Sequence, residues 1–309
     1  MKFIPLHIFN NKTRFDFIGT RWYGFGASIL FSLISFFVLY THGLNWGIDF
    51  TGGALIELRT EQPADLAKMR SALDGQGLGE VTLQNFGDTH NVMIRIQAPQ
   101  DSEQNAIVQK AKSLISSAVP GQIDYRNIEF VGPTVGHELV KSGIMATVFA
   151  CLAIMGYVWF RFEWQFGIGT LLALVHDTIM VIGFYALSRF DFGLNAVAAV
   201  LTIIGYSMND SVVIYDRIRE NMRKYKKMPF DELLNQSMNE TLARTVLTSS
   251  TTLLAALALA LFGGEVIKGF SWSLVFGIIV GTYSSIYISA PTLIYLKIRQ
   301  EEKAQVATA

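Results

Sequence analysis

The stretch Gly205-Tyr-Ser-Met-Asn-Asp-Ser-Val-Val-Ile-Tyr-Asp-Arg-Ile-Arg219 decides the fold, and it continues an apolar run that starts near residue 194. It places Asn209 and Asp210 where a membrane-crossing helix would surround them with hydrocarbon. A carboxylate at that depth is costly, and ionisable residues inside membranes are mostly functional. The stretch therefore predicts a membrane-spanning helix that carries a functional polar site.

The composition also indicates a membrane protein. Of the 309 residues, 51% are hydrophobic and only 16% are charged, which is a low charged fraction for a soluble chain. About 20 helical residues cover the hydrocarbon core of a bilayer, and six stretches are long and apolar enough to do so. We predict a polytopic α-helical membrane protein with one span before a polar domain and five after it, at residues 22–40, 139–160, 165–187, 194–214, 246–262 and 270–295.

Positive charge is distributed unevenly along the chain. Basic residues gather before the first span, through the stretch 217–244 and in the tail, whereas the connections near Arg189 and Lys268 carry one each. Because basic residues stay in the cytoplasm, we expect both termini on the inner side of the cytoplasmic (cell inner) membrane. The predicted domains are a cytoplasmic segment 1–21, a first span 22–40, an extracytoplasmic domain 41–137, a five-helix bundle 138–296 with the cytoplasmic segment 217–244, and a cytoplasmic tail 297–309.

Residues 41–137 have the pattern of a small α+β domain. Alternating apolar residues predict strands at 54–59, 81–86, 91–96 and 123–131, the third after a turn Gly87-Asp-Thr-His90. Helical spacing predicts helices at 63–73, with Pro63 at its start, and at 102–117, capped by Ser102. The order β-α-β-β-α-β is typical of a ferredoxin-like split βαβ fold with both helices on one face of the sheet.

This domain shows no sequence pattern of catalysis. It has no cluster of His, Cys and carboxylates at metal-ligand spacing, no nucleophile elbow and no phosphate loop. Cys151 is the only cysteine, so an intramolecular disulfide is excluded. We expect no enzyme activity, metal or cofactor, and we interpret the domain as a binding or docking module.

The basic segment 217–244 has an amphipathic pattern after the break at Met228-Pro229. We expect it to lie along the membrane surface, where its cations meet anionic lipid. A nucleic-acid partner is not expected, because charge beside a membrane span already has a topological cause. The apolar residues of the pattern are Phe230, Leu233, Leu234 and Met238.

Four motifs, in order along nearly the whole chain, resemble those of the SecD/SecF family of the bacterial protein-export machinery. They are Gly47-Ile-Asp-Phe-Thr-Gly-Gly53, Val131-Gly-Pro-Thr-Val-Gly136, the opening stretch extended to Asn221, and Arg244-Thr-Val-Leu-Thr-Ser-Ser-Thr-Thr-Leu-Leu254. The arrangement of one span, an external domain and five spans also resembles half of a transporter of the resistance-nodulation-division superfamily. Six spans and one small domain fit the smaller type of subunit in the family.

The resemblance implies a function and partners. It implies a subunit of a SecDF complex that uses the proton motive force to assist Sec-dependent protein translocation across the membrane. The implied partners are a SecD-like subunit, the Sec translocation channel, the translocating polypeptide, membrane lipid and protons. Two alternatives are half of a proton-coupled efflux pump for small molecules and a scaffold subunit that conducts nothing.

The first motif contains three glycines and an acidic residue. Gly47, Gly52 and Gly53 would supply permissive backbone where the chain leaves the membrane. For Asp49 we consider three roles, which are capping the turn, pairing with Arg59 and handling substrate.

The second motif lies where the domain meets the next span. Gly132, Pro133 and Gly136 suit a joint between the two, which would act as a hinge if the domain swings or as a rigid elbow if it does not.

Within the opening stretch, Ser207 and Ser211 lie about one helical turn from Asn209 and Asp210. We therefore expect part of this helix to present a hydrophilic face.

Two further charged sites accompany it. Asp216 is expected to be a solvated carboxylate at the helix end beside Arg217 and Arg219. His176 and Asp177 occupy the centre of the third span, either as a structural hydrogen-bonding pair or as part of a proton relay.

Together these groups suggest a hydrated proton path with Asp210 as the carrier. Arg244 is the expected cation, because its long side chain can reach into the bundle from the cytoplasmic end. Protonation of Asp210 would remove its attraction to Arg244 and change the preferred packing of the spans. Hydroxyls at the start of the fifth span would either join helices or hold water along the path; they are Thr245, Thr248, Ser249, Ser250, Thr251 and Thr252.

Overall fold

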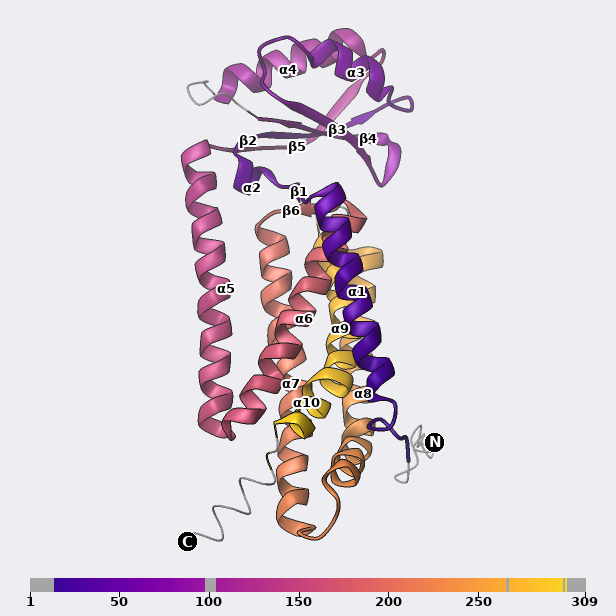
Figure 1. Ribbon diagram of the computed structural model, residues 1–309. Coiled ribbons are helices and arrows are strands. Elements are labelled where there is room, and N and C mark those ends of the chain that lie inside the picture. The colour runs from indigo at the N-terminus through magenta and orange to yellow at the C-terminus, as the bar shows by residue number, and fades with distance from the viewer. Residues whose placement is uncertain (1–13, 98–103, 265–266, 297, 299–309) are drawn as a thin grey trace, which may run out of the picture. The chain divides into compact units, whose positions relative to one another are not determined.

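A computed structural model describes residues 14–97, 104–264, 267–296 and 298 (Figure 1). The chain divides into two compact units, and each is considered by itself. We call residues 1–44, 148–190 and 198–309 the membrane unit, and residues 45–147 and 191–197 the sheet unit.

Six helical segments of the described residues are long and apolar enough to cross a membrane, as predicted. The last of them is not regular throughout, because a π-helix interrupts it between α9 and α10. The elements are α1 (Arg21–His42), α5 (Pro133–Arg161), α6 (Trp164–Ser188), α7 (Leu194–Lys224), α8 (Phe230–Phe262), and the final span of α9 (Lys268–Ser284), the π-helix Ser285–Ser289 and α10 (Ala290–Tyr295).

The basic segment between the fourth and fifth spans differs from its prediction in where the flanking helices end. It is helical at both ends, with α7 continuing to Lys224 and α8 beginning at Phe230 just after Pro229. Pro229 separates the two helices because proline cannot lie inside a continuous helix. The flanking charged residues are good helix formers, so both helices extend into this segment. The segment is thus a hairpin of two helix ends, and its place along the membrane surface stays a prediction.

The apolar residues of this hairpin pack against protein. Leu233, Leu234 and Met238 are buried in a core that Tyr215 and Ile218 of α7 also line. The amphipathic pattern therefore marks an apolar face of α8, and the neighbouring helix α7 covers that face.

Asp216 also differs from its prediction, because α7 does not end there. Its carboxylate pairs with Arg161 at 3.0 Å, while Arg217 binds Glu220 and Glu240, both at 2.6 Å.

The sheet unit contains a four-stranded antiparallel sheet in the order β3-β4-β2-β5. Its elements are β2 (Gly53–Thr60), α3 (Leu66–Leu73), β3 (Val81–Phe86), β4 (Asp88–Ile96), α4 (Gln104–Ala118) and β5 (Ile123–Val131). Helices α3 and α4 lie on the same face of the sheet (Figure 1). Alternate strand residues therefore share one core with both helices, namely Ala54, Ile56, Leu58, Leu83, Val92, Ile94 and Ile96 with Met69, Leu73, Ile107, Ala111 and Ile115.

Local details of this unit refine the predicted boundaries. Helix α3 begins at Leu66 because Asp65 accepts the backbone N–H groups of Ala67 and Lys68. The turn before β4 is tighter than expected, since Asp88 already pairs with Phe86 around Gly87. The predicted cap Ser102 lies outside the described residues.

Two short elements complete the sheet unit. Strand β1 (Asn45–Trp46) pairs in parallel with β6 (Asp191–Phe192), and the single turn α2 (Ile48–Thr51) follows β1. This pairing joins the segment after α1 to the segment before α7.

Candidate intramembrane polar site

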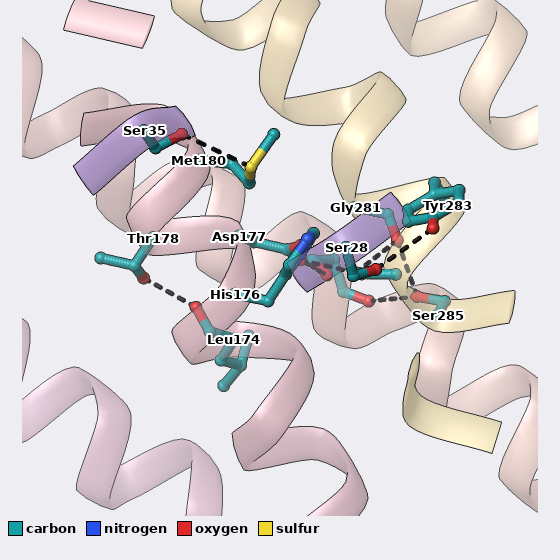
Figure 2. A network of polar contacts seen from close by, with 12 residues as sticks. Ser28, Ser35, Leu174, His176, Asp177, Thr178, Met180, Gly281, Tyr283 and Ser285 are labelled. Carbon is teal, nitrogen blue, oxygen red and sulfur yellow. Dashed lines mark hydrogen bonds and ion pairs between the residues drawn. The ribbon is translucent and has the colours of Figure 1, made fainter. Parts of the chain in front are cut away.

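Asp177 of α6 is a polar group of the membrane unit that has no exposed surface and has three side-chain partners. One carboxylate oxygen lies 3.0 Å from Nδ1 of His176. The other accepts hydroxyl hydrogen bonds from Ser207 at 2.5 Å and Ser284 at 2.8 Å. Figure 2 shows His176 and Asp177 beside Tyr283. Helices α6, α7 and α9 thus meet at one buried carboxylate.

A row of hydroxyls continues from Asp177 along α7. Ser207, Ser211 and Tyr215 are spaced by four residues and therefore share one helix face. Ser285 bonds to Ser211 at 3.1 Å and donates to the Ser207 carbonyl at 3.2 Å.

The row ends where Tyr215 meets Ser289 at 2.5 Å. Its partners Ser285 and Ser289 are the first and last residues of the π-helix, a feature frequent at functional sites. Sequence reasoning singled out Ser207 and Ser211 but missed Tyr215, Ser285 and Ser289. The four-residue spacing of Gly281, Ser285 and Ser289, which places them on one helix face, was a usable signal.

Asp210 lies on a different side of α7, about 100° around the helix from Ser211. It is 2% exposed, and its carboxylate accepts one long hydrogen bond, from the Ser249 hydroxyl of α8 at 3.3 Å. Ser249 also bonds to Thr282 at 2.8 Å. The structure thus brings together Asp210 and Ser249, as expected, but in a second cluster separate from Asp177.

Three other predicted members do not touch Asp210. Asn209 is exposed, because adjacent helix residues point about 100° apart. The hydrophilic part of α7 is therefore divided, with Ser207 and Ser211 on one side, Asp210 on another and Asn209 exposed. Thr251 is exposed and donates to the Thr248 carbonyl of its own helix.

Arg244 is the third. It is exposed, and among the described residues no ion pair joins it to Asp210, so its charge acts on that carboxylate from a distance.

The first motif lies in the sheet unit. Gly52 and Gly53 have φ angles of 71° and 116°, and a Cβ on Gly53 would lie 2.1 Å from the Ile96 carbonyl oxygen. Asp49 does not pair with Arg59; its carboxylate accepts the backbone N–H of Leu194, the first residue of α7, at 2.7 Å.

The second motif lies close to the first. Pro133 is the first residue of α5, and the Gly136 N–H donates to the Gly132 carbonyl at 2.9 Å. A Cβ on Gly136 would lie 3.2 Å from the backbone of Gly52 and Phe50. A glycine allows this close approach of α5.

A metal is not favoured by this geometry. Across the described ranges, no group of three or more His, Cys, Asp or Glu side chains is placed to hold a metal ion.

Six membrane-crossing helices with buried carboxylates and a small sheet unit define a polytopic membrane protein of transporter type. The family described as "Protein export membrane protein SecD/SecF, C-terminal" matches residues 110–299, and the SecD/SecF GG motif matches residues 37–64. The chain belongs to the SecF branch of the SecD/SecF family.

Individual relatives agree with this assignment. The chain is 52% identical to the protein translocase subunit SecF of Rickettsia felis over 95% of both chains, and 51% identical to that of Rickettsia bellii over 98% of this chain and 100% of the relative. Among solved structures, SecDF of Thermus thermophilus, described as a translocon-associated membrane protein, superposes with a TM-score of 0.84 at 37% identity. SecDF in a super-membrane-facing form gives 0.68 at 36% identity. The chain spans 39% and 40% of the lengths of those two SecDF chains while 94% and 96% of it are covered.

Proposed function

We propose that this chain is the SecF-type subunit of a complex that uses the proton motive force to assist Sec-dependent protein translocation. The observation that carries the proposal is Asp210, a buried carboxylate with a single long hydrogen bond in the middle of a membrane-crossing helix. Such a group can gain and lose a proton without dismantling a bonded network.

The coupling step follows from electrostatics. With Asp210 charged, the distant Arg244 attracts it across the α7–α8 contact; with Asp210 protonated, that attraction is gone and the two helices favour a different packing. One charge crossing a potential of 100 mV supplies about 2.3 kcal/mol, which is enough to shift a modest two-state equilibrium. The proposed relay comprises Asp210, Ser249 and Arg244, whereas His176 and Asp177 form a separate bonded cluster that holds helices together.

The charge distribution supports an orientation with both termini in the cytoplasm. One hollow of the membrane unit, where α5 and α7 end, has four basic and two acidic lining residues, which are Arg161, Arg219, Arg223 and Lys224 with Asp216 and Glu220. The N-terminal segment lies with the same hairpin, since the backbone N–H groups of residues 15 and 17 bond to Asn239 and Asn235 of α8. Residues 15 and 17 thus bond to the hairpin that carries these basic residues, which supports the proposed orientation under the positive-inside rule.

The sheet unit then belongs outside the cytoplasm. Its strand order, with β2 between β4 and β5, is that of the split βαβ arrangement. We propose that it is an extracytoplasmic ferredoxin-like domain within residues 41–137 that contacts the translocating polypeptide.

A partner subunit is part of the proposal. The chain matches only 39% of the SecDF chain from Thermus thermophilus, and the exposed Asn209 would face hydrocarbon if nothing covered it. A SecD-like membrane subunit that meets the polar side of α7 would satisfy it. The Sec channel would bind the assembled complex.

The substitution Asp210→Asn tests the proposal. An amide keeps the size and the hydrogen-bond acceptor but cannot release a proton near neutral pH. We expect normal accumulation and partner co-purification, with loss of the gradient-dependent part of export and of proton uptake in inner-membrane vesicles. Asp216→Asn is the matched control, since it removes a charge from an exposed ion pair on the same helix.

Wild-type proton uptake and export in Asp210→Asn vesicles would contradict the proton-coupled function. That result would favour the scaffold subunit, in which buried polar groups only join helices. The efflux-pump alternative is distinguished from the export function by its substrate. An efflux-pump half would carry out gradient-driven transport of small apolar molecules in vesicles that contain no Sec client protein.

A further inference from the structure

The sheet unit contains a partly buried group of three bonded polar side chains from three separate segments. Arg95 of β4 is 7% exposed, and its guanidinium contacts Asp191 of β6 at 2.6 Å and donates to the side-chain oxygen of Asn45 of β1 at 2.9 Å. Asn45 in turn donates to the Asp191 carboxylate at 2.6 Å. The three side chains close a triangle that ties the sheet to the segment before α7.

A second contact holds the same place. Asp49 accepts the Leu194 N–H at the first turn of α7, where a carboxylate also meets the positive end of the helix dipole. Backbone packing there leaves no room for larger residues, since a Cβ on Gly193 would lie 2.5 Å from the Asp49 carboxylate, and one on Gly47 would lie 3.1 Å from Gly193. The segments 45–52 and 191–194 are therefore interlocked.

Helix α7 runs without a break from Leu194 to Lys224 and carries Asp210. Asp210 lies 16 residues beyond Leu194, or about 24 Å along the axis at a rise of about 1.5 Å per residue. Because α7 is continuous over these 16 residues, a displacement of its first turn would be passed along one helix toward the buried carboxylate.

We propose that Asp49 and Arg95 are positioning residues that fix the sheet unit to the start of α7, so that movement of the domain and the state of Asp210 are coupled through one helix. This inference rests on the proposed function. Asp49, the acidic residue of the first motif, thereby has a role in coupling. The contact between segments 45–52 and 191–194 is expected to stay closed throughout the transport cycle.

The first test separates coupling from proton transfer. In inner-membrane vesicles, Asp49→Ala should keep gradient-driven proton uptake near the wild-type rate but lower export by about fivefold or more, because the helix cap is lost. Asp49→Asn, whose amide oxygen still accepts the Leu194 N–H, should restore most of the export. Asp65→Ala is the matched control, since Asp65 caps α3 in the same unit without touching α7.

The outcomes are distinguishable. Equal losses of uptake and export in Asp49→Ala would overturn the inference alone, as would unchanged export. Wild-type vesicles without gradient-driven proton uptake would overturn the proposed function and this inference with it.

The second test asks whether the contact is permanent. Trp46 and Phe192 are register partners in the β1–β6 pair, and strand neighbours lie about 4.8 Å apart, within the range that a disulfide spans. In a Cys151→Ser background, which is free of cysteine, Trp46→Cys with Phe192→Cys should crosslink on oxidation. Export by the oxidised chain should equal that of the same chain after reduction. Loss of export on oxidation that reduction reverses would show that the segments separate in the cycle, and would overturn the proposal.

Discussion

Two aspartates in the membrane unit, Asp177 on α6 and Asp210 on α7, have the same chemistry and nearly the same burial but different surroundings. Asp177 has three side-chain partners from three elements. Asp210 has one, at 3.3 Å. A buried carboxylate with three side-chain partners is fixed in place and holds the helices around it together, whereas one with a single weak partner is less constrained.

The comparison assigns helix packing to the Asp177 site and proton transport to the Asp210 site. Asp177 and the serines of α7 and the π-helix form a hydrogen-bonded joint between α6, α7 and the last span. Asp210 faces α8 and accepts a hydrogen bond from the Ser249 hydroxyl of that helix. The exposed Arg244 belongs to the same helix as Ser249. We therefore expect substitutions at the first site to change stability most and substitutions at the second to change transport most.

The largest expected effect is that of Asp177→Ala. It leaves Ser207, Ser284 and His176 without their shared acceptor in a buried place, at a cost of about 3 kcal/mol. Thermal unfolding of the purified protein in detergent should show a midpoint lowered by several degrees. Thr178→Ala is the control, because its hydroxyl bonds only to the Leu174 carbonyl of its own helix. Normal stability combined with lost proton uptake would place Asp177 in the relay instead.

The next effect concerns Arg244. Because no ion pair joins it directly to Asp210, its charge should matter more than the planar shape of the guanidinium. We expect Arg244→Lys to keep most gradient-driven export in vesicles and Arg244→Met to lose about tenfold, a change of about 1.4 kcal/mol. Equal damage by lysine and methionine would indicate a direct guanidinium contact in another state of the cycle.

The elements of the fold could largely be predicted from the sequence. Six apolar stretches gave six helical segments, and strands at 81–86 and 123–131 match β3 and β5 in both bounds. Period and length are local properties, so hydrophobic patterning suffices to find them. The hairpin of α7 and α8 was missed because an amphipathic pattern does not tell whether lipid or another helix covers its apolar face.

The site was harder to predict for a related reason. The sequence placed Asp210, Asp177 and Ser249 correctly inside spans, but which helix each one faces depends on rotation about the helix axis. A rotation of about 100° between neighbours separates the exposed Asn209 from the buried Asp210. The hydrogen bond from the Leu194 N–H to Asp49 joins residues 145 positions apart, and such a contact cannot be predicted from local sequence.

A smaller effect is expected at an exposed carboxylate of the sheet unit. Asp88 accepts the backbone N–H groups of His90 and Asn91 at 2.7 and 3.0 Å, and these bonds, the His90 one first, lower its pKa below the usual value. A lowered pKa means that Asp88 stabilises the fold above about pH 4, its unfolded value, and that this contribution is lost as the pH falls through the folded value.

Protection factors of the amides around the β3–β4 turn, which correct for the intrinsic pH dependence of exchange, should therefore fall in the wild type as the pH drops below about 4. Asp88→Asn, which accepts the same bonds without titrating, should show a flatter profile. An identical pH dependence in the two proteins would assign the change to another group.

The smallest effect separates two hydroxyls of α8 that the sequence treats alike. Ser249 donates to Asp210 and bonds Thr282, while Thr251 is exposed and donates to the Thr248 carbonyl. Ser249→Ala should slow proton uptake in vesicles by a few-fold, because it removes the one direct partner of Asp210, although water can replace part of that link. Thr251→Ala should leave uptake at the wild-type rate. If Thr251→Ala were the more damaging of the two, the exposed side of α8 would have to carry part of the proton path, and the relay would run along the subunit surface where a partner covers it.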